Sequence, residues 1–154
     1  MAQTQLEQAE FADNPEPRCA VVLLLDTSGS MHGQPIAELN DGLKEFDRAL
    51  KVDRLAALRV EVAVITFGGS VRALNVATDG NHEIPCDAEQ AFVTADNFHP
   101  PSLSAGGETP MGEAVRRALA VFRRHTGCRR AWELRRYPRC AAGNATVQVP
   151  PVFR

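Results

Sequence analysis

One acidic residue and two hydroxyl residues, Asp26, Ser28 and Ser30, alternate along a short loop, with Gly29 between the serines. Residues at positions i, i+2 and i+4 of a tight turn can aim three oxygens at one point, and the glycine lets the backbone fold closely enough to do so. One carboxylate with several hydroxyls is a set of hard oxygen donors. Such a set suits Mg²⁺ or Mn²⁺ completed by water, and it does not suit zinc, which prefers nitrogen and sulfur ligands.

The loop lies between a predicted strand and a predicted helix. Residues 19–25 are continuously apolar, which is typical of a strand buried on both faces in the middle of a parallel sheet. Ligands bind at the carboxyl edge of such sheets, so the placement favours a binding site. Asp and Ser are also common in turns and helix caps, and that alternative stays open for the loop taken alone. The helix that follows opens at Pro35, and its apolar residues recur at steps of three and four: Ile36, Leu39, Leu43, Phe46 and Leu50.

A second hydroxyl loop, residues 106–110, precedes another predicted helix and contains Thr109. Thr109 has two roles open to it: it could supply an oxygen to the same metal ion, or it could be the N-cap of the helix that starts at Pro110. The apolar face of that helix is formed by Met111, Ala114, Val115, Ala118, Leu119 and Phe122.

The remaining pattern predicts an α/β fold. Residues 58–66 read as a second strand, Gly68-Gly69 as a turn, and residues 71–76 as the returning strand of a hairpin. Turn-forming residues dominate positions 77–107, where we expect only a short strand around residues 91–93. After Cys128 the sequence has no helical or strand period of useful length until residues 145–149. Strand, helix, hairpin, loop and helix is an α/β order.

Composition bounds the class of protein. The chain has 154 residues, 44% of them hydrophobic and 23% charged, which suits one globular domain. The net charge of −2 gives no reason to expect nucleic acid or a membrane as a partner. We expect a cytoplasmic protein, since the N-terminus lacks the features of a signal peptide. The four cysteines form no CxxC pair, so a disulfide framework and a zinc knuckle are both poor interpretations.

These motifs carry a family resemblance. Val-Val-Leu-Leu-Leu-Asp-Thr-Ser-Gly-Ser-Met at residues 21–31 resembles the first strand and metal-ion-dependent adhesion site (MIDAS) loop of von Willebrand factor A (vWA) domains. Gly-Glu-Thr-Pro-Met-Gly at residues 107–112 resembles the segment that carries that family's metal-binding threonine. The sequences of both segments are similar to those of the bacterial TerY-type members, which are associated with tellurite resistance and stress response.

The resemblance implies a doubly wound, Rossmann-like sheet with one antiparallel edge strand and flanking helices. It implies that Ser28, Ser30 and Thr109 offer side-chain oxygens to Mg²⁺ or Mn²⁺, and that Asp26 holds the ion directly or through water. The ion would keep one position for an acidic residue of a partner protein. The domain would then be a protein-binding module and not a catalyst.

The sequence departs from the family downstream of Thr109. The family's last ligand is an aspartate on a later loop, and no Asp follows Asp96 here. We therefore expect weak metal binding and an incomplete sheet, with residues 1–17 as a flexible lead, residues 18–127 as the N-terminal portion of the domain, and residues 128–154 as an aperiodic tail. Residues 129–154 contain six arginines and one glutamate, a net charge of +5, so the first 128 residues carry −7 of the total of −2. One hypothesis makes this tail a frameshifted or otherwise aberrant segment, and its rival makes it a basic tail that binds an acidic partner.

Two other functions stay open. The first is a hydrolytic enzyme that uses Asp26 as a catalytic carboxylate, although Ser28 stands where phosphoryl transfer would need a second acid, and no nucleophile–base set has a supporting motif. His32 lies near the loop and is interpreted as a solvated residue. The second alternative is a structural fragment that binds no metal.

Overall fold

Strands and helices alternate along the chain in the computed structural model, which describes residues 16–78, 82–86 and 89–136, the last nine of these by their backbone alone. The strands are β1 (Cys19–Asp26), β2 (Val60–Gly68), β3 (Ser70–Asn75), β4 (His82–Ile84) and β5 (Val93–Thr94). The helices are α2 (Gln34–Val52), α3 (Arg54–Arg59) and α4 (Met111–Arg136), with short 3₁₀ turns at Gly29–Met31, Glu89–Ala91 and Ala95–Asn97. None of the helices in these ranges is long and apolar enough to span a bilayer.

The sheet has the order β1-β2-β3-β4, and β5 pairs with β2. β1 runs parallel to β2, with Cys19 opposite Val60 and Asp26 opposite Phe67. The pairings β2–β3, β3–β4 and β2–β5 are antiparallel. The fold is therefore the expected α/β sheet with flanking helices, but three of its four strand pairings are antiparallel, which is more than the one antiparallel edge strand expected.

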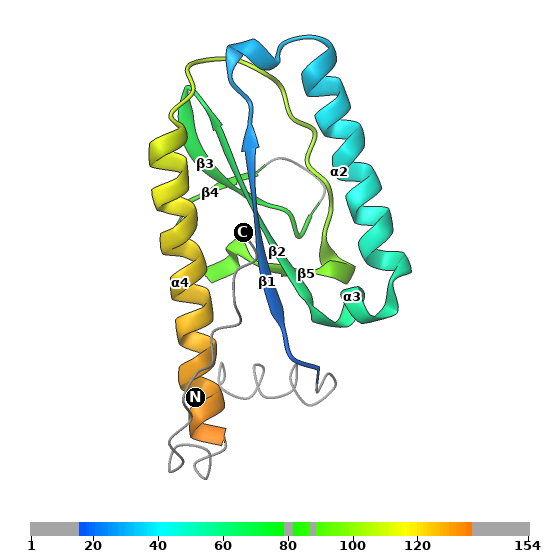
Figure 1. Cartoon of the computed structure of the whole chain (residues 1–154), viewed down its shortest axis with the longest axis vertical. Coiled ribbons are helices and arrows are strands. Elements are labelled where there is room, and N and C mark those ends of the chain that lie inside the picture. The colour runs from blue at the N-terminus through cyan, green and yellow to red at the C-terminus, as the bar shows by residue number, and fades with distance from the viewer. Residues whose placement is uncertain (1–15, 79–81, 87–88, 137–154) are drawn as a thin grey trace, which may run out of the picture.

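Helices cover both faces of the sheet (Figure 1). Alternate residues of β2 point to opposite sides: Val62 and Val64 pack in the cluster that contains Leu43 and Leu50 of α2, whereas Ile65 packs in the cluster that contains residues of α4. Residues 61–67 of β2 are all buried, so β2 is the central strand of the described sheet.

β1 differs from its prediction in one respect. Its side chains do pack on both faces, since Leu23 and Leu25 contact the cluster on the α2 side and Val22 and Leu24 contact the cluster on the α4 side. However, residues 20–26 are only half-buried, because within the described residues β1 pairs with β2 alone and is the edge strand. The expectation of a strand in the middle of a parallel sheet is wrong for this part of the chain.

The hairpin of β2 and β3 is confirmed, and α2 begins at Gln34 with Pro35 in its first turn, as predicted. The expected short strand around residues 91–93 is a 3₁₀ turn followed by β5, and β4 was not predicted. The helix after Thr109 is much longer than expected. It continues through residues 128–136, where the sequence showed no period, so the expected loss of pattern after Cys128 is wrong for the backbone up to Arg136. The remainder of the predicted tail, residues 137–154, and most of the predicted lead, residues 1–15, lie outside the described residues.

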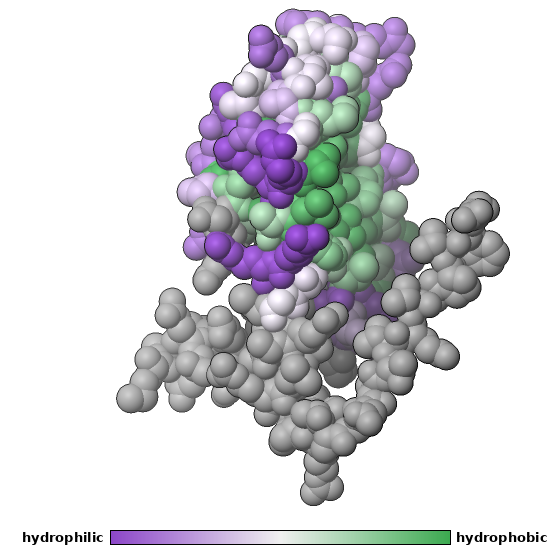
Figure 2. Space-filling model, turned by 60° about the vertical axis from the view of Figure 1, so that its left-hand side comes forward, coloured by the Kyte–Doolittle hydropathy of each residue, from purple (hydrophilic) through white to green (hydrophobic). Residues whose placement is uncertain are grey.

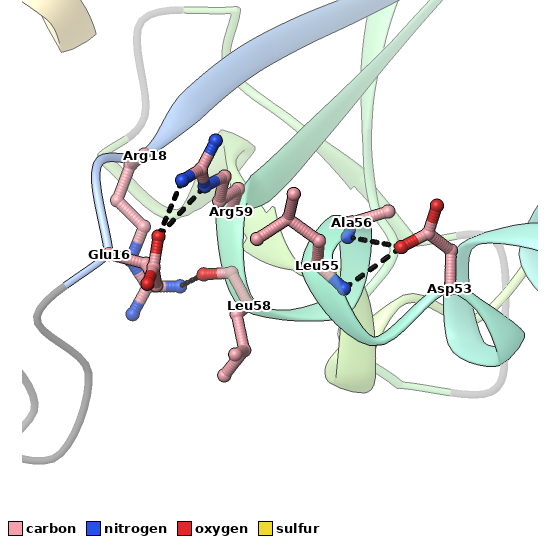
Figure 3. Close-up of polar contacts among 7 residues, drawn as sticks. All are labelled: Glu16, Arg18, Asp53, Leu55, Ala56, Leu58 and Arg59. Atoms are coloured by element: carbon pink, nitrogen blue, oxygen red, sulfur yellow. Dashed lines mark hydrogen bonds and ion pairs between the residues drawn. The ribbon is translucent and has the colours of Figure 1, made fainter.

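The short helix α3 explains why β2 begins two residues later than predicted. Asp53 caps α3, since its Oδ1 accepts hydrogen bonds from the backbone N–H groups of Leu55 (2.9 Å) and Ala56 (3.1 Å) (Figure 3). At the other end of α3, Arg59 donates two hydrogen bonds to Glu16, and Arg18 donates to the carbonyl of Leu58. These contacts fix the chain that enters β1 against the chain that enters β2.

Candidate metal site

The predicted oxygen donors of the first loop converge where β1 ends. Asp26 is the last residue of β1, and its Oδ1 accepts a hydrogen bond from the backbone N–H of Ser28 at 2.8 Å. The hydroxyl oxygens of Ser28 and Ser30 lie 3.1 Å apart. Ser28 is only 1% exposed, whereas Ser30 is exposed. The loop therefore holds its three polar side chains close together, as the i, i+2, i+4 spacing predicted.

Two of the oxygens have no hydrogen-bond partner within the residues that the structure describes. These are the second carboxylate oxygen of Asp26 and the hydroxyl of Thr109. Thr109 lies just before α4, which starts at Met111, and the Met111 N–H bonds to the backbone carbonyl of Thr109 at 2.9 Å. Thr109 therefore does not cap α4 through its side chain, and the hydroxyl is available to a ligand.

Backbone hydrogen bonds join the second loop to the first. The N–H of Gly29 donates to the carbonyl of Gly107 at 2.9 Å, and the N–H of Gly106 donates to the carbonyl of Thr27 at 2.8 Å. Thr109 lies two residues beyond Gly107 and is exposed. The structure thus brings the segment that carries Thr109 against the loop that carries Ser28 and Ser30.

The turn between β2 and β3 is a third component that the sequence did not reveal as part of the site. The N–H of Gly69 donates to the carbonyl of Glu108 at 2.7 Å. A Cβ atom at Gly107 would lie 2.5 Å from the Cα of Gly69, and a Cβ atom at Gly68 would lie 2.3 Å from the carbonyl oxygen of Thr27. Glycine at these positions lets three backbone segments meet without side chains between them. The sequence predicted the Gly68-Gly69 turn but gave no sign of what it would contact.

Helix α2 holds the segment that leads into the second loop. The side-chain amide of Asn40 donates to the carbonyl of Leu103 at 2.9 Å, and its oxygen accepts from the N–H of Leu103 at 2.8 Å. The side chain of Leu103 is buried in the core on the α2 side. Earlier in the same segment, Lys51 donates to the carbonyl of Phe98 at 2.9 Å. Thr109 therefore follows a stretch of chain that α2 fixes at two points.

A polar cleft of about 390 Å³ lies beside the loops. It begins at Thr27, Gly68 and Gly106, which are the residues where the three backbone segments meet, and it extends along β3. An ion pair between Arg72 and Glu83 lines it. Further polar groups in its wall come from Thr66, Ser70, Ser102 and Ser104. The cleft therefore adjoins the point where the three backbone segments meet.

A second polar cluster lies away from the loops. Glu61 on β2 is buried, and its carboxylate lies 2.7 Å from Nε2 of His125 on α4 and 3.9 Å from Nε of Arg18. The ring of Phe92 stacks on the His125 ring at 3.9 Å between centroids. These residues lie in no motif of the sequence. No group of three or more His, Cys, Asp or Glu side chains in the described ranges could hold a metal ion, so the hydroxyl-rich loops remain the candidate site there.

Comparison with known proteins gives one positive result. The model of the von Willebrand factor type A domain matches residues 20–139, which is most of the chain and includes both loops. This match runs 12 residues past residue 127, the predicted end of the domain. No curated protein sequence matches the chain at a significant level.

Proposed function

Because the chain belongs to the von Willebrand factor type A domain family, whose members are mostly protein-interaction modules, we propose that it binds a partner protein through a divalent metal ion. The ion is Mg²⁺ or Mn²⁺. Ser28, Ser30 and Thr109 provide hydroxyl oxygens to it, and Asp26 binds it directly or through water. An acidic side chain of the partner completes the coordination.

One observation carries this proposal. Two loops that are about 80 residues apart in the sequence are joined by the Gly29–Gly107 and Gly106–Thr27 hydrogen bonds, and their polar side chains include oxygens without a protein partner in the described chain. An unpaired carboxylate oxygen and an unpaired hydroxyl at the carboxyl edge of a sheet are the donors that a hard cation binds. Turn formation alone needs neither of them, because the backbone bonds already hold the turn.

The charge of the donor set explains why a partner carboxylate is needed. Asp26 is the one acidic side chain among the four proposed ligands, so a divalent ion bound there would keep a net positive charge. No Asp follows Asp96 in the sequence to provide a second carboxylate from downstream. We therefore expect weak binding of the ion alone and mutual enhancement between ion and partner, since the carboxylate of the partner neutralises the remaining charge.

We also propose a bacterial tellurite-resistance or stress-response assembly as the setting of this interaction. Its only support is the similarity of the two motif sequences to those of TerY-type members. The alternative in which Asp26 is a catalytic carboxylate of a hydrolase has less support. Asp26 accepts a hydrogen bond from Ser28, and the side chain of the nearby His32 is exposed and has no polar contact in the described residues. No general base is therefore held beside it.

Calorimetric titration with Mg²⁺ and Mn²⁺ tests the metal site directly. The variant Asp26→Asn keeps an oxygen that can accept the Ser28 N–H and removes the charge, so it should keep the fold and lose metal binding. Asp41→Asn on the exposed side of α2 is the matched control and should bind metal like the wild type. Equal metal binding by all three proteins would refute the proposed ligands, and no metal binding by the wild type would favour the structural fragment.

Partner capture tests the rest of the proposal. Partner retention should require Mg²⁺, disappear with a chelator, and be lost in Asp26→Asn but not in Asp41→Asn. Capture that is unaffected by the chelator would contradict metal-dependent binding. A hydrolytic activity lost in Asp26→Asn would favour the enzyme alternative.

A further inference from the structure

The polar cleft beside the loops has the sheet as its floor. In the antiparallel pairings Thr66 lies opposite Arg72, and Leu74 lies opposite Glu83. Arg72 and Leu74 are two residues apart on β3, so the four side chains project from one face of the sheet. This is the α2 side, because Leu74 packs in the core cluster that contains residues of α2. Residues 102–106 line the same cleft.

The position of the cleft in the sheet separates it from the outer edge of β1. Its floor comes from β2, β3 and β4, and the sheet has the order β1-β2-β3-β4. A segment that paired with the outer edge of β1 would therefore lie on the other side of β2 from this floor. The cleft does not depend on what covers that edge.

The exposed apolar surface is a different feature from the cleft. On the face of the molecule in Figure 2, hydrophobic residues gather in one area with hydrophilic residues above it. The large hydrophobic residues that are exposed in the described ranges lie on α2, α3 and α4, and none of them lines the cleft. The cleft is therefore suited to a polar ligand.

Two buried hydroxyls at the cleft have no hydrogen-bond partner within the residues that the structure describes. Thr27 is 8% exposed and Thr66 is 7% exposed, and both line the cleft. A Cβ atom at Gly68 would lie 2.5 Å from Oγ1 of Thr27, so the glycine leaves room for this hydroxyl. Buried hydroxyls without a partner are costly. A polar group that enters from the cleft would satisfy both of them.

Two opposite charges lie at the exposed end of the cleft. Arg72 and Glu83 form an ion pair and are about half exposed. Nε of Arg72 donates to the hydroxyl of Ser70 at 2.7 Å, and its Nη1 donates to Glu83. Nη2 of Arg72 and the second carboxylate oxygen of Glu83 make no hydrogen bond to the described part of the chain. One donor and one acceptor, each charged, are thus available side by side.

These groups select a class of ligand. The cleft contains one positive and one negative side chain, so it offers no net charge for a polyphosphate or a free metal ion. Within the described ranges no aromatic side chain lines it, so it has no stacking surface for a nucleobase. An α-amino acid carries a carboxylate and an ammonium group on one carbon, which matches the adjacent Arg72 and Glu83. The volume of about 390 Å³ is that of a small-molecule site.

We propose that this cleft binds a free α-amino acid with an uncharged polar side chain, namely serine, threonine, asparagine or glutamine. The α-carboxylate accepts from Arg72, and the α-ammonium group donates to Glu83. The side chain points inward, where its hydroxyl or amide bonds to Thr27 and Thr66. None of the four proposed metal ligands takes part, so the proposal goes beyond metal-dependent protein binding and does not rest on it.

The test titrates the full chain with L-serine, L-threonine, L-asparagine and L-glutamine in the presence of a chelator. Two-dimensional ¹⁵N NMR should show saturable binding of at least one of them, with shifts at the amides of Thr27, Thr66 and Arg72. Binding of none of the four would overturn the proposal. Shifts confined to residues 28–30 and Thr109 would place the ligand on the metal loops and would also overturn it.

Derivatives of the tightest ligand test the two charges. Its N-acetyl derivative lacks the ammonium group and its α-amide lacks the carboxylate, and each should bind at least about tenfold more weakly. Equal binding of the N-acetyl derivative would make the cleft a simple anion site and would refute the proposal. Equal binding of glycerol would assign the cleft to polyols and would refute it too.

Variants with matched controls test the named side chains. Thr66→Val keeps the shape and removes the hydroxyl, so it should weaken binding by about fivefold or more, whereas Thr126→Val on α4 should not. Glu83→Gln should abolish the preference for the free ligand over its N-acetyl derivative, whereas Glu45→Gln, which alters an exposed ion pair on α2, should keep it. Circular dichroism verifies the fold of each variant. Unchanged affinity of folded Thr66→Val, or an unchanged preference in folded Glu83→Gln, would overturn the proposal.

Discussion

Gly107 is the residue at which the structure makes its sharpest prediction about the loops. Its φ is +80°, a conformation that costs a residue with a side chain about 1–2 kcal/mol. The added Cβ in Gly107→Ala would also lie 2.5 Å from both the Cα and the N atom of Gly69, which are backbone atoms and cannot rotate away. Overpacking of this kind costs about 1–3 kcal/mol. We therefore expect Gly107→Ala to lower the free energy of unfolding by about 2–5 kcal/mol in total.

The neighbouring glycine provides the control. A Cβ at Gly106 would meet no heavy atom within 4 Å, and its φ is not positive. Gly106→Ala should therefore change the free energy of unfolding by less than about 1 kcal/mol, and by reducing the freedom of the unfolded chain it could even stabilise the protein. Urea unfolding followed by circular dichroism measures both variants. Equal midpoints for the two variants would refute the close packing of the loop on the β2–β3 turn.

Three further predictions concern other parts of the structure. His125→Ala removes the hydrogen bond to the buried carboxylate of Glu61 and should lower the free energy of unfolding in urea by about 2–4 kcal/mol. The control Arg48→Ala breaks an exposed ion pair and should lower it by less than about 1 kcal/mol. Similar losses for the two variants would contradict the burial of the Glu61–His125 pair. Asp53→Ala removes the cap of α3 and should cost about 1 kcal/mol, and a loss below about 0.3 kcal/mol would show that the cap is unimportant. Saturating Mg²⁺ at about 100 times the dissociation constant should stabilise the wild type by about 2.7 kcal/mol and leave Asp26→Asn unchanged in thermal melts, and stabilisation of both would place the ion elsewhere.

The sequence predicted the elements whose patterns are local and long. The apolar run of β1, the β2–β3 hairpin and the amphipathic α2 were all recognisable because their residues repeat at the period of the element they form. The six-residue helix α3 was missed, although Asp53 followed by Arg54-Leu55-Ala56-Ala57 carries an N-cap signal. β4 has three residues and is defined by its pairing with β3, which no local pattern shows.

Long-range contacts limited what could be predicted for the sites. The grouping of Asp26, Ser28 and Ser30 was expected because it is local, and the proximity of the second loop was expected only through the family resemblance. No local pattern marks Glu61 as part of a buried cluster, because its partner His125 is 64 residues away. The close approach of Gly107 to the β2–β3 turn depends on how α2 holds residues 98–103, and that is likewise a property of the tertiary structure.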